Sequence, residues 1–313
     1  MDFVNLPFLN RTALLLALTV VEIGPVSAEV FYDAQLGYFD DDNVSRAKWD
    51  NSIFTDTHYD GLFSIGMFSD FDDGLSMTVI GTAKYASYQS WKGLSHTDFG
   101  GAVDLRKKIG LGSMVPSVGG NVEFKRQSYD NKVRDQDQWD VSFYWQKRLD
   151  EQWDIKIDLG YFISTAKAPV PAGPAGTNTD PGPGPGPGPG MAKPGDTFDQ
   201  NAFYLGIGSG FAFAEIHFLT LDYQFRSGDV ASTAIPNTTI VDASTAITAD
   251  TVFGDQFFAY KLDADTHSLS AGWDIAITEQ TSITFEYEYQ NTDAGQSIEY
   301  KNKLISMQLL ISF

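Results

Sequence analysis

The last residues of the chain alternate between apolar and polar side chains and end on an aromatic residue. Counted back from the C-terminus, Phe313, Ile311, Leu309 and Met307 are apolar, and the residues between them are polar except at Leu310. A period of two is that of a β-strand with two different faces. With apolar side chains toward lipid and polar ones toward a wet interior, the pattern predicts the closing strand of a transmembrane β-barrel. The last strand of a soluble sandwich is the alternative interpretation of this segment.

This C-terminal segment resembles that of bacterial outer-membrane β-barrel proteins. The resemblance rests on Phe313, Ile311 and Leu309. It implies that these residues form an assembly signal, which the barrel-assembly machinery recognises in its client. It also implies that the chain lies in the cell outer membrane, in contact with lipid and lipopolysaccharide.

The other end of the chain has the pattern of a secretory signal peptide. Arg11 precedes an apolar run over residues 12–21, and a small-x-small motif follows at Val26, Ser27 and Ala28. The run is too short to cross a bilayer as a helix. We therefore expect residues 1–28 to be a signal peptide and residues 29–313 to form one barrel domain.

The composition excludes several classes of protein. The chain has no cysteine, which rules out a disulfide scaffold and a thiolate metal site. Its net charge of −20 argues against nucleic acid as a partner. Aromatic residues make up 14% of the chain, a share that suits the two interfacial girdles of a membrane barrel.

After residue 28 the sequence divides into alternating segments near the length of a tilted membrane strand. In the clearest of them, Trp153, Ile155 and Ile157 alternate with Asp154 and Lys156. Short links and long links follow one another in turn, as periplasmic turns and extracellular loops do in outer-membrane barrels. The sequence thus predicts an all-β, transmembrane, up-and-down antiparallel barrel of about twelve strands. The predicted strands are 30–39, 60–71, 75–88, 97–107, 117–129, 138–148, 152–163, 200–211, 216–226, 266–276, 281–291 and 300–313.

Two long links carry unusual sequences. Residues 164–199 include an alternating Pro-Gly run from Pro181 to Gly190, which can continue neither a helix nor a sheet. We expect an extracellular tether there. Residues 227–265 contain short β-prone runs such as Thr239-Ile240-Val241. This second extracellular loop forms a hairpin outside the membrane, folds into the lumen, or extends the barrel to fourteen strands, and the sequence does not choose among the three.

Strand parity predicts which side chains face the lumen. Acidic residues outnumber basic ones on that face, so an open lumen would prefer cations. In the alternative interpretation the same charges pair with their neighbours and help to fill a closed barrel. The predicted pore-lining residues are Asp104, Arg106, Glu123, Lys125, Asp140, Asp154, Lys156, Asp158, Asp222, Arg226, Glu286 and Glu288.

No pattern in the sequence predicts catalytic residues, a cofactor or a metal site. Ser95, His96 and Asp98 bring a hydroxyl, an imidazole and a carboxylate together, but neighbours on a strand point to opposite faces. We therefore expect a narrow channel, not an enzyme, that passes small polar or cationic solutes. The alternative is a structural barrel that sheathes or anchors a partner protein in its lumen or in the periplasm, as part of a secretion or redox complex.

Overall fold

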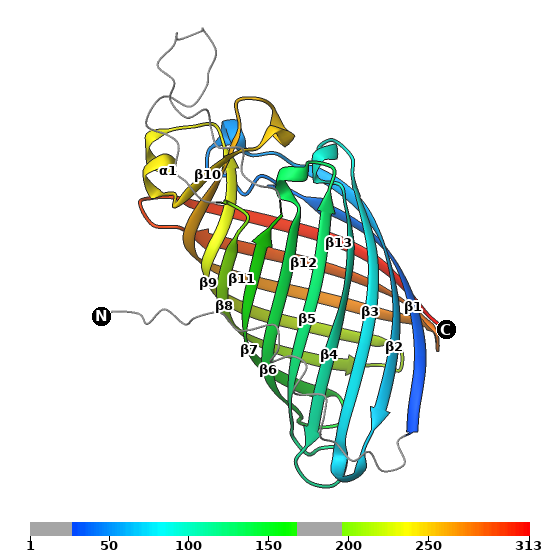
Figure 1. The fold of residues 1–313 in the computed structure, drawn as a ribbon. Coiled ribbons are helices and arrows are strands. Elements are labelled where there is room, and N and C mark those ends of the chain that lie inside the picture. The colour runs from blue at the N-terminus through cyan, green and yellow to red at the C-terminus, as the bar shows by residue number, and fades with distance from the viewer. Residues whose placement is uncertain (1–26, 168–195) are drawn as a thin grey trace, which may run out of the picture.

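The computed structural model describes residues 27–167 and 196–313. The expected signal peptide, apart from its last two residues, and the Pro-Gly run from Pro181 to Gly190 lie outside this described part. Thirteen antiparallel strands form one sheet, and all of them except the short β10 form a closed ring of twelve (Figure 1). The predicted twelve-stranded, up-and-down barrel is confirmed.

The strands of the ring follow one another in chain order, and the last of them pairs back to the first. They occupy the twelve segments that the sequence predicts, with different ends. The strands are β1 (Ser27–Asp41), β2 (Asp56–Asp70), β3 (Leu75–Tyr88), β4 (His96–Lys108), β5 (Ser117–Tyr129), β6 (Gln136–Arg148), β7 (Trp153–Ala166), β8 (Gln200–Phe213), β9 (His217–Ala234), β11 (Phe258–Thr278), β12 (Thr281–Asp293) and β13 (Glu299–Ser312).

The other elements are short and lie in the links between strands. Within residues 27–167 and 196–313, no helix is long and apolar enough to cross a membrane. The links contain β10 (Ala246–Ala249), α1 (Thr238–Ala243) and the 3-10 helices η1 (Asp50–Ser52), η2 (Asp72–Gly74), η3 (Lys92–Leu94), η4 (Lys132–Arg134) and η5 (Thr251–Phe253).

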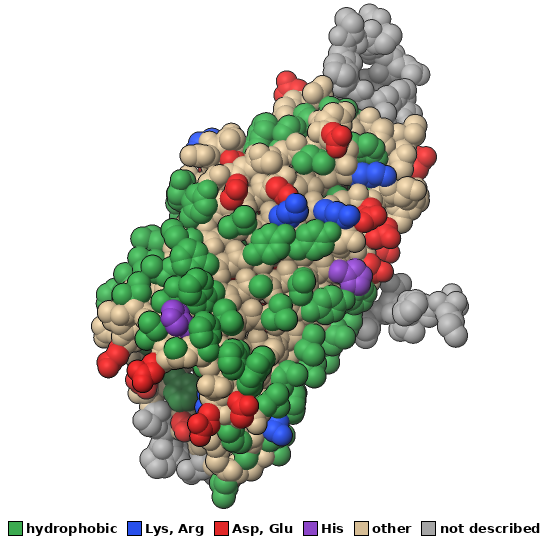
Figure 2. Space-filling view, turned by 180° about the vertical axis from the view of Figure 1, so that it is seen from behind, with side chains coloured by type: hydrophobic (Ala, Val, Ile, Leu, Met, Phe, Trp, Pro, Cys, Tyr) green, Lys and Arg blue, Asp and Glu red, His purple; other side chains and the backbone are tan. Residues whose placement is uncertain are grey.

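The alternation within each strand sorts side chains to the two faces of the wall. The register pairs Met307 with Phe285, and both side chains are exposed on the outer surface. On β7, Ile157 and Leu159 are exposed on that surface, while Asp158 between them lies on the inner face. Hydrophobic side chains cover the wall between zones where charged side chains gather (Figure 2). Such an apolar band is the surface that a barrel presents to lipid, so the chain is an outer-membrane β-barrel. The long links gather at one end of the barrel, which we call the extracellular end because long loops lie outside the cell in barrels of this kind.

The C-terminal strand closes the ring against the first strand. Leu36 of β1 faces Leu309 of β13, and Ala34 faces Ile311. The backbone N–H of Phe313 donates to the carbonyl of Tyr32 at 2.9 Å, and the Phe313 side chain is 71% exposed. The predicted alternation at the C-terminus therefore coincides with the seam of the barrel.

Glycines in the wall receive large side chains from neighbouring strands. A Cβ atom at Gly160 would lie 2.3 Å from Cζ of Tyr204, and one at Gly119 would lie 2.3 Å from Cζ of Tyr144. Both rings therefore lie over the backbone of the next strand, where only glycine leaves room for them. Tyr204 also donates to Asp140 at 2.7 Å. These two rings are thus held against the wall of the barrel.

The packing of the Tyr204 ring on Gly160 can be tested by mutation. Replacing Gly160 with valine should displace the ring and break its hydrogen bond to Asp140, at a cost of roughly 1–3 kcal/mol in the free energy of unfolding. Thermal unfolding in detergent measures the loss. Gly61→Val is the matched control, because a Cβ there would meet only Leu36 at an ordinary 3.8 Å. Equal stability of the two variants would show that the packing of Tyr204 on Gly160 does not stabilise the barrel.

The strands β9 and β11 run further out of the membrane than predicted. The sequence prediction ends the first at residue 226 and begins the second at 266, whereas β9 continues to Ala234 and β11 begins at Phe258. The two pair along this extension, and β10 adds to the edge of β11. The hairpin outside the membrane is confirmed, and the extension to fourteen strands is wrong. Tyr260 and Leu262 are fully buried in the extracellular core, so this segment has no lipid-facing side to predict from.

Candidate functional site

The extracellular mouth of the barrel is covered by loops that pack on one another. We call this cover the cap and define it as residues 42–55, 89–95 and 235–257. The ring of Phe253 stacks on that of Phe54, with centroids 4.9 Å apart, and lies 5.0 Å from that of Trp91. Leu94 and Phe257 are buried in the same cluster. In the order of the strands, the link between β3 and β4 faces the link between β9 and β11 across the ring, so the cap bridges the mouth.

Asp250 ties the cap to the link between β5 and β6. Its side chain is fully buried and forms an ion pair with Arg134, at 2.5 Å between Nη2 and Oδ2. The same carboxylate accepts hydrogen bonds from Thr233 Oγ1 at 2.9 Å and from Asn131 Nδ2 at 3.2 Å. A buried carboxylate is stable only with such a set of donors, so Asp250 holds three parts of the extracellular end in one arrangement.

The first loop reaches across the mouth to β9. The backbone N–H of Thr233 donates to the carbonyl of Ser45 at 2.8 Å, and Ser232 Oγ donates to the carbonyl of Arg46 at 2.6 Å. Asn43 is buried, and its Oδ1 accepts from the backbone N–H of Ala47 at 3.0 Å. These bonds fix the loop in place and bring the side chain of Arg46 into the space below.

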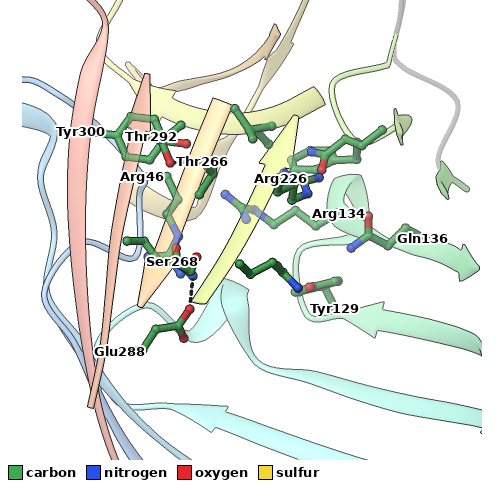
Figure 3. A pocket seen from close by; sticks show the side chains of 16 residues that line it. Arg46, Tyr129, Arg134, Gln136, Arg226, Thr266, Ser268, Glu288, Thr292 and Tyr300 are labelled. Atoms are coloured by element: carbon green, nitrogen blue, oxygen red, sulfur yellow. Dashed lines mark hydrogen bonds between the residues drawn. The ribbon is translucent and has the colours of Figure 1, made fainter. Parts of the chain in front are cut away.

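Beneath the cap lies a cavity of about 300 Å³, shown in Figure 3. Its wall combines hydroxyls and amides with charged side chains from several strands and two loops. Arg46 and Arg134 reach it from the loops, and Arg226 and Glu288 reach it from β9 and β12. The cavity can therefore bind polar groups of either charge.

The structure places all of the predicted pore-lining residues on the inner face, but at different places along the lumen. Arg226 and Glu288 both line the cavity beneath the cap. Other predicted residues line two further cavities, of about 440 Å³ and about 160 Å³. Arg106, Asp154 and Lys156 line the larger of these, and Glu123, Lys125 and Asp140 line the smaller.

Three of the remaining predicted carboxylates are held by a glycine or a hydrogen bond on a neighbouring strand. A Cβ at Gly206 would lie 2.8 Å from both carboxylate oxygens of Asp158, and one at Gly208 would lie 2.1 Å from Oδ1 of Asp222. Asp104 accepts from the hydroxyl of Tyr144 at 3.0 Å. Glu286 lies opposite Gly272 of β11. That these four carboxylates line the path of a solute stays a prediction.

Two charged residues of the cavity escaped the sequence prediction. Arg46 and Arg134 lie in loops, where strand parity assigns no face. Arg134 is positioned by Asp250, which lies 116 residues further along the chain. Only contacts between distant loops place these arginines over the lumen, so no local pattern would have found them.

The cluster of Ser95, His96 and Asp98 does not form a catalytic arrangement. Ser95 Oγ accepts from the backbone N–H of Tyr88 at 3.0 Å, and His96 Nδ1 lies 2.8 Å from the carbonyl of Leu94. His96 Nε2 is 3.7 Å from Asp98 Oδ2. Among the described residues, no hydrogen bond joins the serine hydroxyl to the imidazole, and no group of three or more His, Asp or Glu side chains is arranged to hold a metal ion.

The fold is similar to that of a solved outer-membrane channel from Pseudomonas putida F1. That structure matches with a TM-score of 0.56 and 12% identity, over 93% of this chain and 97% of that chain. The NanC porin matches with a TM-score of 0.45 and 8% identity, over 90% and 98% of the two chains. The β-domain of the Bordetella autotransporter BrkA matches with a TM-score of 0.43 and 12% identity, over 91% and 99%. No family model and no curated protein matches this sequence. At 12% identity, the likeness to the Pseudomonas channel shows a shared fold.

Proposed function

We propose that the protein is a passive channel for small polar solutes across the outer membrane. The observation that supports this most directly is a polar inner face whose bulky side chains lie against the wall, as Tyr204 does over Gly160. Within the described part of the chain, the contacts that join opposite sides of the ring belong to the cap. The cap narrows the extracellular entrance, which restricts the solutes to small ones.

We further propose that the acidic inner wall gives the channel a preference for cations. Asp222 on β9 and Glu286 on β12 lie on either side of β11 and interact electrostatically. Asp158 on β7 adds a third carboxylate to the inner face, and Lys156 is the nearest basic neighbour in sequence. An excess of carboxylates along a lumen favours cations by Coulomb attraction.

Planar-bilayer recordings on the purified protein test both proposals. Discrete conductance is expected from the barrel alone, with a reversal potential in a salt gradient that indicates cation preference. The double variant Asp222→Asn and Glu286→Gln should lower that preference without affecting folding, since ladder hydrogen bonds are backbone bonds. The preference should also weaken as salt screens the charges, over about 10 Å at 0.1 M.

The control for this variant removes a charge outside the lumen. Asp263→Asn changes an exposed carboxylate on the extracellular extension of β11 and should leave the reversal potential unchanged. Anion preference in the unmodified barrel would contradict the cation proposal. Absence of any conductance would contradict the channel.

The cap favours a second candidate function, because a covered mouth also suits a barrel that does not conduct. Such a barrel would anchor a partner protein in the periplasm or in the lumen, as a component of a secretion or redox complex. Extraction from native membranes in a mild detergent should then recover a stoichiometric partner. Conductance without any such partner would exclude this second function.

A further inference from the structure

Two side chains of opposite charge face the cavity beneath the cap and do not pair with each other. Arg226 donates through Nη2 to the backbone carbonyl of Asp229 at 2.8 Å and lies 5.5 Å from the ring of Phe162. Glu288 accepts from Gln290 Nε2 at 2.7 Å, the dashed bond in Figure 3. In residues 27–167 and 196–313, neither side chain forms an ion pair. Each therefore faces the cavity without an ion-pair partner.

The other two arginines of the cavity are already neutralised. Arg46 pairs with Asp41 at 3.3 Å, and Arg134 pairs with Asp250 at 2.5 Å. After this pairing, the cavity presents one guanidinium, that of Arg226, and one carboxylate, that of Glu288. Its net charge is then zero, but its two ends differ in sign.

The register holds these two residues apart along the strands. Arg226 faces Thr266, which in turn faces Thr292 on β12. Glu288 lies four residues before Thr292 (292 − 288 = 4) on the same strand. At about 3.4 Å per residue this is an offset of roughly 14 Å in the strand direction, with Arg226 nearer the cap. Hydroxyls of Thr266 and Ser268 line the space between them.

We propose that this cavity binds a small zwitterionic solute, with its carboxylate at Arg226 and its ammonium group at Glu288. The proposal rests on the channel function and names the solute class that the entrance selects. A solute with both charges compensates both side chains at once, through charge-assisted hydrogen bonds. A simple anion would leave Glu288 unpaired, and a simple cation would leave Arg226 unpaired. The discrimination thus comes from what each wrong solute leaves uncompensated.

The size of the cavity agrees with this class of solute. Its volume of about 300 Å³ is at the lower end of the range for small-molecule sites. The amide of Gln290 and the hydroxyls between the charges can hydrogen-bond to polar groups in the middle of the solute. The site therefore suits a molecule of the size of an amino acid.

Isothermal titration calorimetry on the purified full chain in detergent tests the proposal with three five-carbon probes. These are 5-aminovalerate, which carries both charges, valerate, which carries only the carboxylate, and pentylamine, which carries only the ammonium group. The zwitterion should bind about tenfold more tightly than either single-charge probe, because each hydrogen-bonded charge contributes about that factor. Equal affinity for the zwitterion and a single-charge probe would overturn the proposal.

Two variants test which charged group of the solute binds to which side chain. In Arg226→Gln, 5-aminovalerate should bind no better than pentylamine, and in Glu288→Gln it should bind no better than valerate. Arg226→Lys keeps the charge and should retain the preference for the zwitterion. If Arg226→Gln does not fold, the lysine variant is measured in its place. Arg148→Gln and Glu299→Gln are the matched controls, since they remove the same charges outside this cavity. An unchanged preference in either cavity variant would sink the proposal.

The experiments distinguish a failure of the zwitterion proposal from a failure of the channel proposal. Calorimetry in detergent needs no conductance, so absence of zwitterion binding would leave the bilayer result standing. Absence of conductance with intact zwitterion binding would leave a binding barrel that does not conduct. Heat-modifiable migration in electrophoresis shows that each variant is folded before its affinity is measured.

Discussion

Replacing Asp250 with alanine should open the cap and raise the single-channel conductance of the barrel several-fold. The substitution leaves the guanidinium of Arg134, which is only 15% exposed, without its carboxylate. Breaking a buried ion pair in this way costs about 3–5 kcal/mol. It also removes the acceptor of the hydrogen bonds from Thr233 and Asn131. The transmembrane wall shares none of these contacts, so we expect the cap to loosen while the barrel stays folded.

Single-channel recording measures this effect, and liposome swelling with neutral sugars of increasing size gives a second measure. Asp255→Ala is the matched control, because it removes an exposed carboxylate from the same loop. Its conductance should equal that of the unmodified protein. If the Asp250 variant is folded and its conductance and sugar limit are also unchanged, the cap does not control the entrance.

The transmembrane wall follows from the sequence because its two faces meet different solvents. On β7 the run from Trp153 to Tyr161 alternates without interruption, and each outer side chain faces lipid while each inner one faces the lumen. A residue's face then depends only on its parity, which is a local property. The same reasoning places Arg226 and Glu288 on the inner face without any knowledge of their neighbours.

The extension of β9 and β11 above the membrane does not follow from the sequence because its apolar side chains are buried in the extracellular core. Val230 on β9 and Leu262 on β11 pair with each other above the membrane and pack into the extracellular core. On β11 the alternation above the membrane is reversed: Leu262 and Ala264 are apolar and buried, while Asp263 and Asp265 are polar and exposed. The prediction therefore ended both strands where apolar side chains stop facing outward.

The composition of the site depends on contacts that parity cannot supply. Arg134 is neutralised by Asp250 because distant loops fold over the mouth, and Arg46 is neutralised by Asp41 at the end of β1, just before its own loop. Sequence reasoning counted charges on the inner face and arrived at an acidic lumen. It could not show that the loop arginines enter the cavity, or that only Arg226 and Glu288 remain unpaired there.

The second large effect concerns assembly, and Phe313→Asp should remove most of the folded barrel from the outer membrane. The side chain of Phe313 is 71% exposed and lies at the end of the wall, where an added charge costs the folded barrel only about 0–1 kcal/mol. The bond from its backbone N–H to the carbonyl of Tyr32 does not depend on the side chain, so the variant can keep it. A residue that contributes little to the folded state and yet ends the closing strand has the properties of an assembly signal. We therefore propose that the assembly machinery recognises this C-terminal strand, and we expect the loss in cells.

Refolding from urea into detergent separates recognition from stability. Without the assembly machinery, Phe313→Asp should fold with nearly the yield of the unmodified chain, and Phe313→Tyr should behave normally in both settings. Gln280→Asp is the matched control, because it adds the same charge at an exposed residue in a periplasmic turn beside the C-terminal strand. Equal losses in cells and in detergent would mean that Phe313 stabilises the seam between β1 and β13. Unchanged folded barrel in the outer membrane would mean that its aromatic ring has no part in assembly.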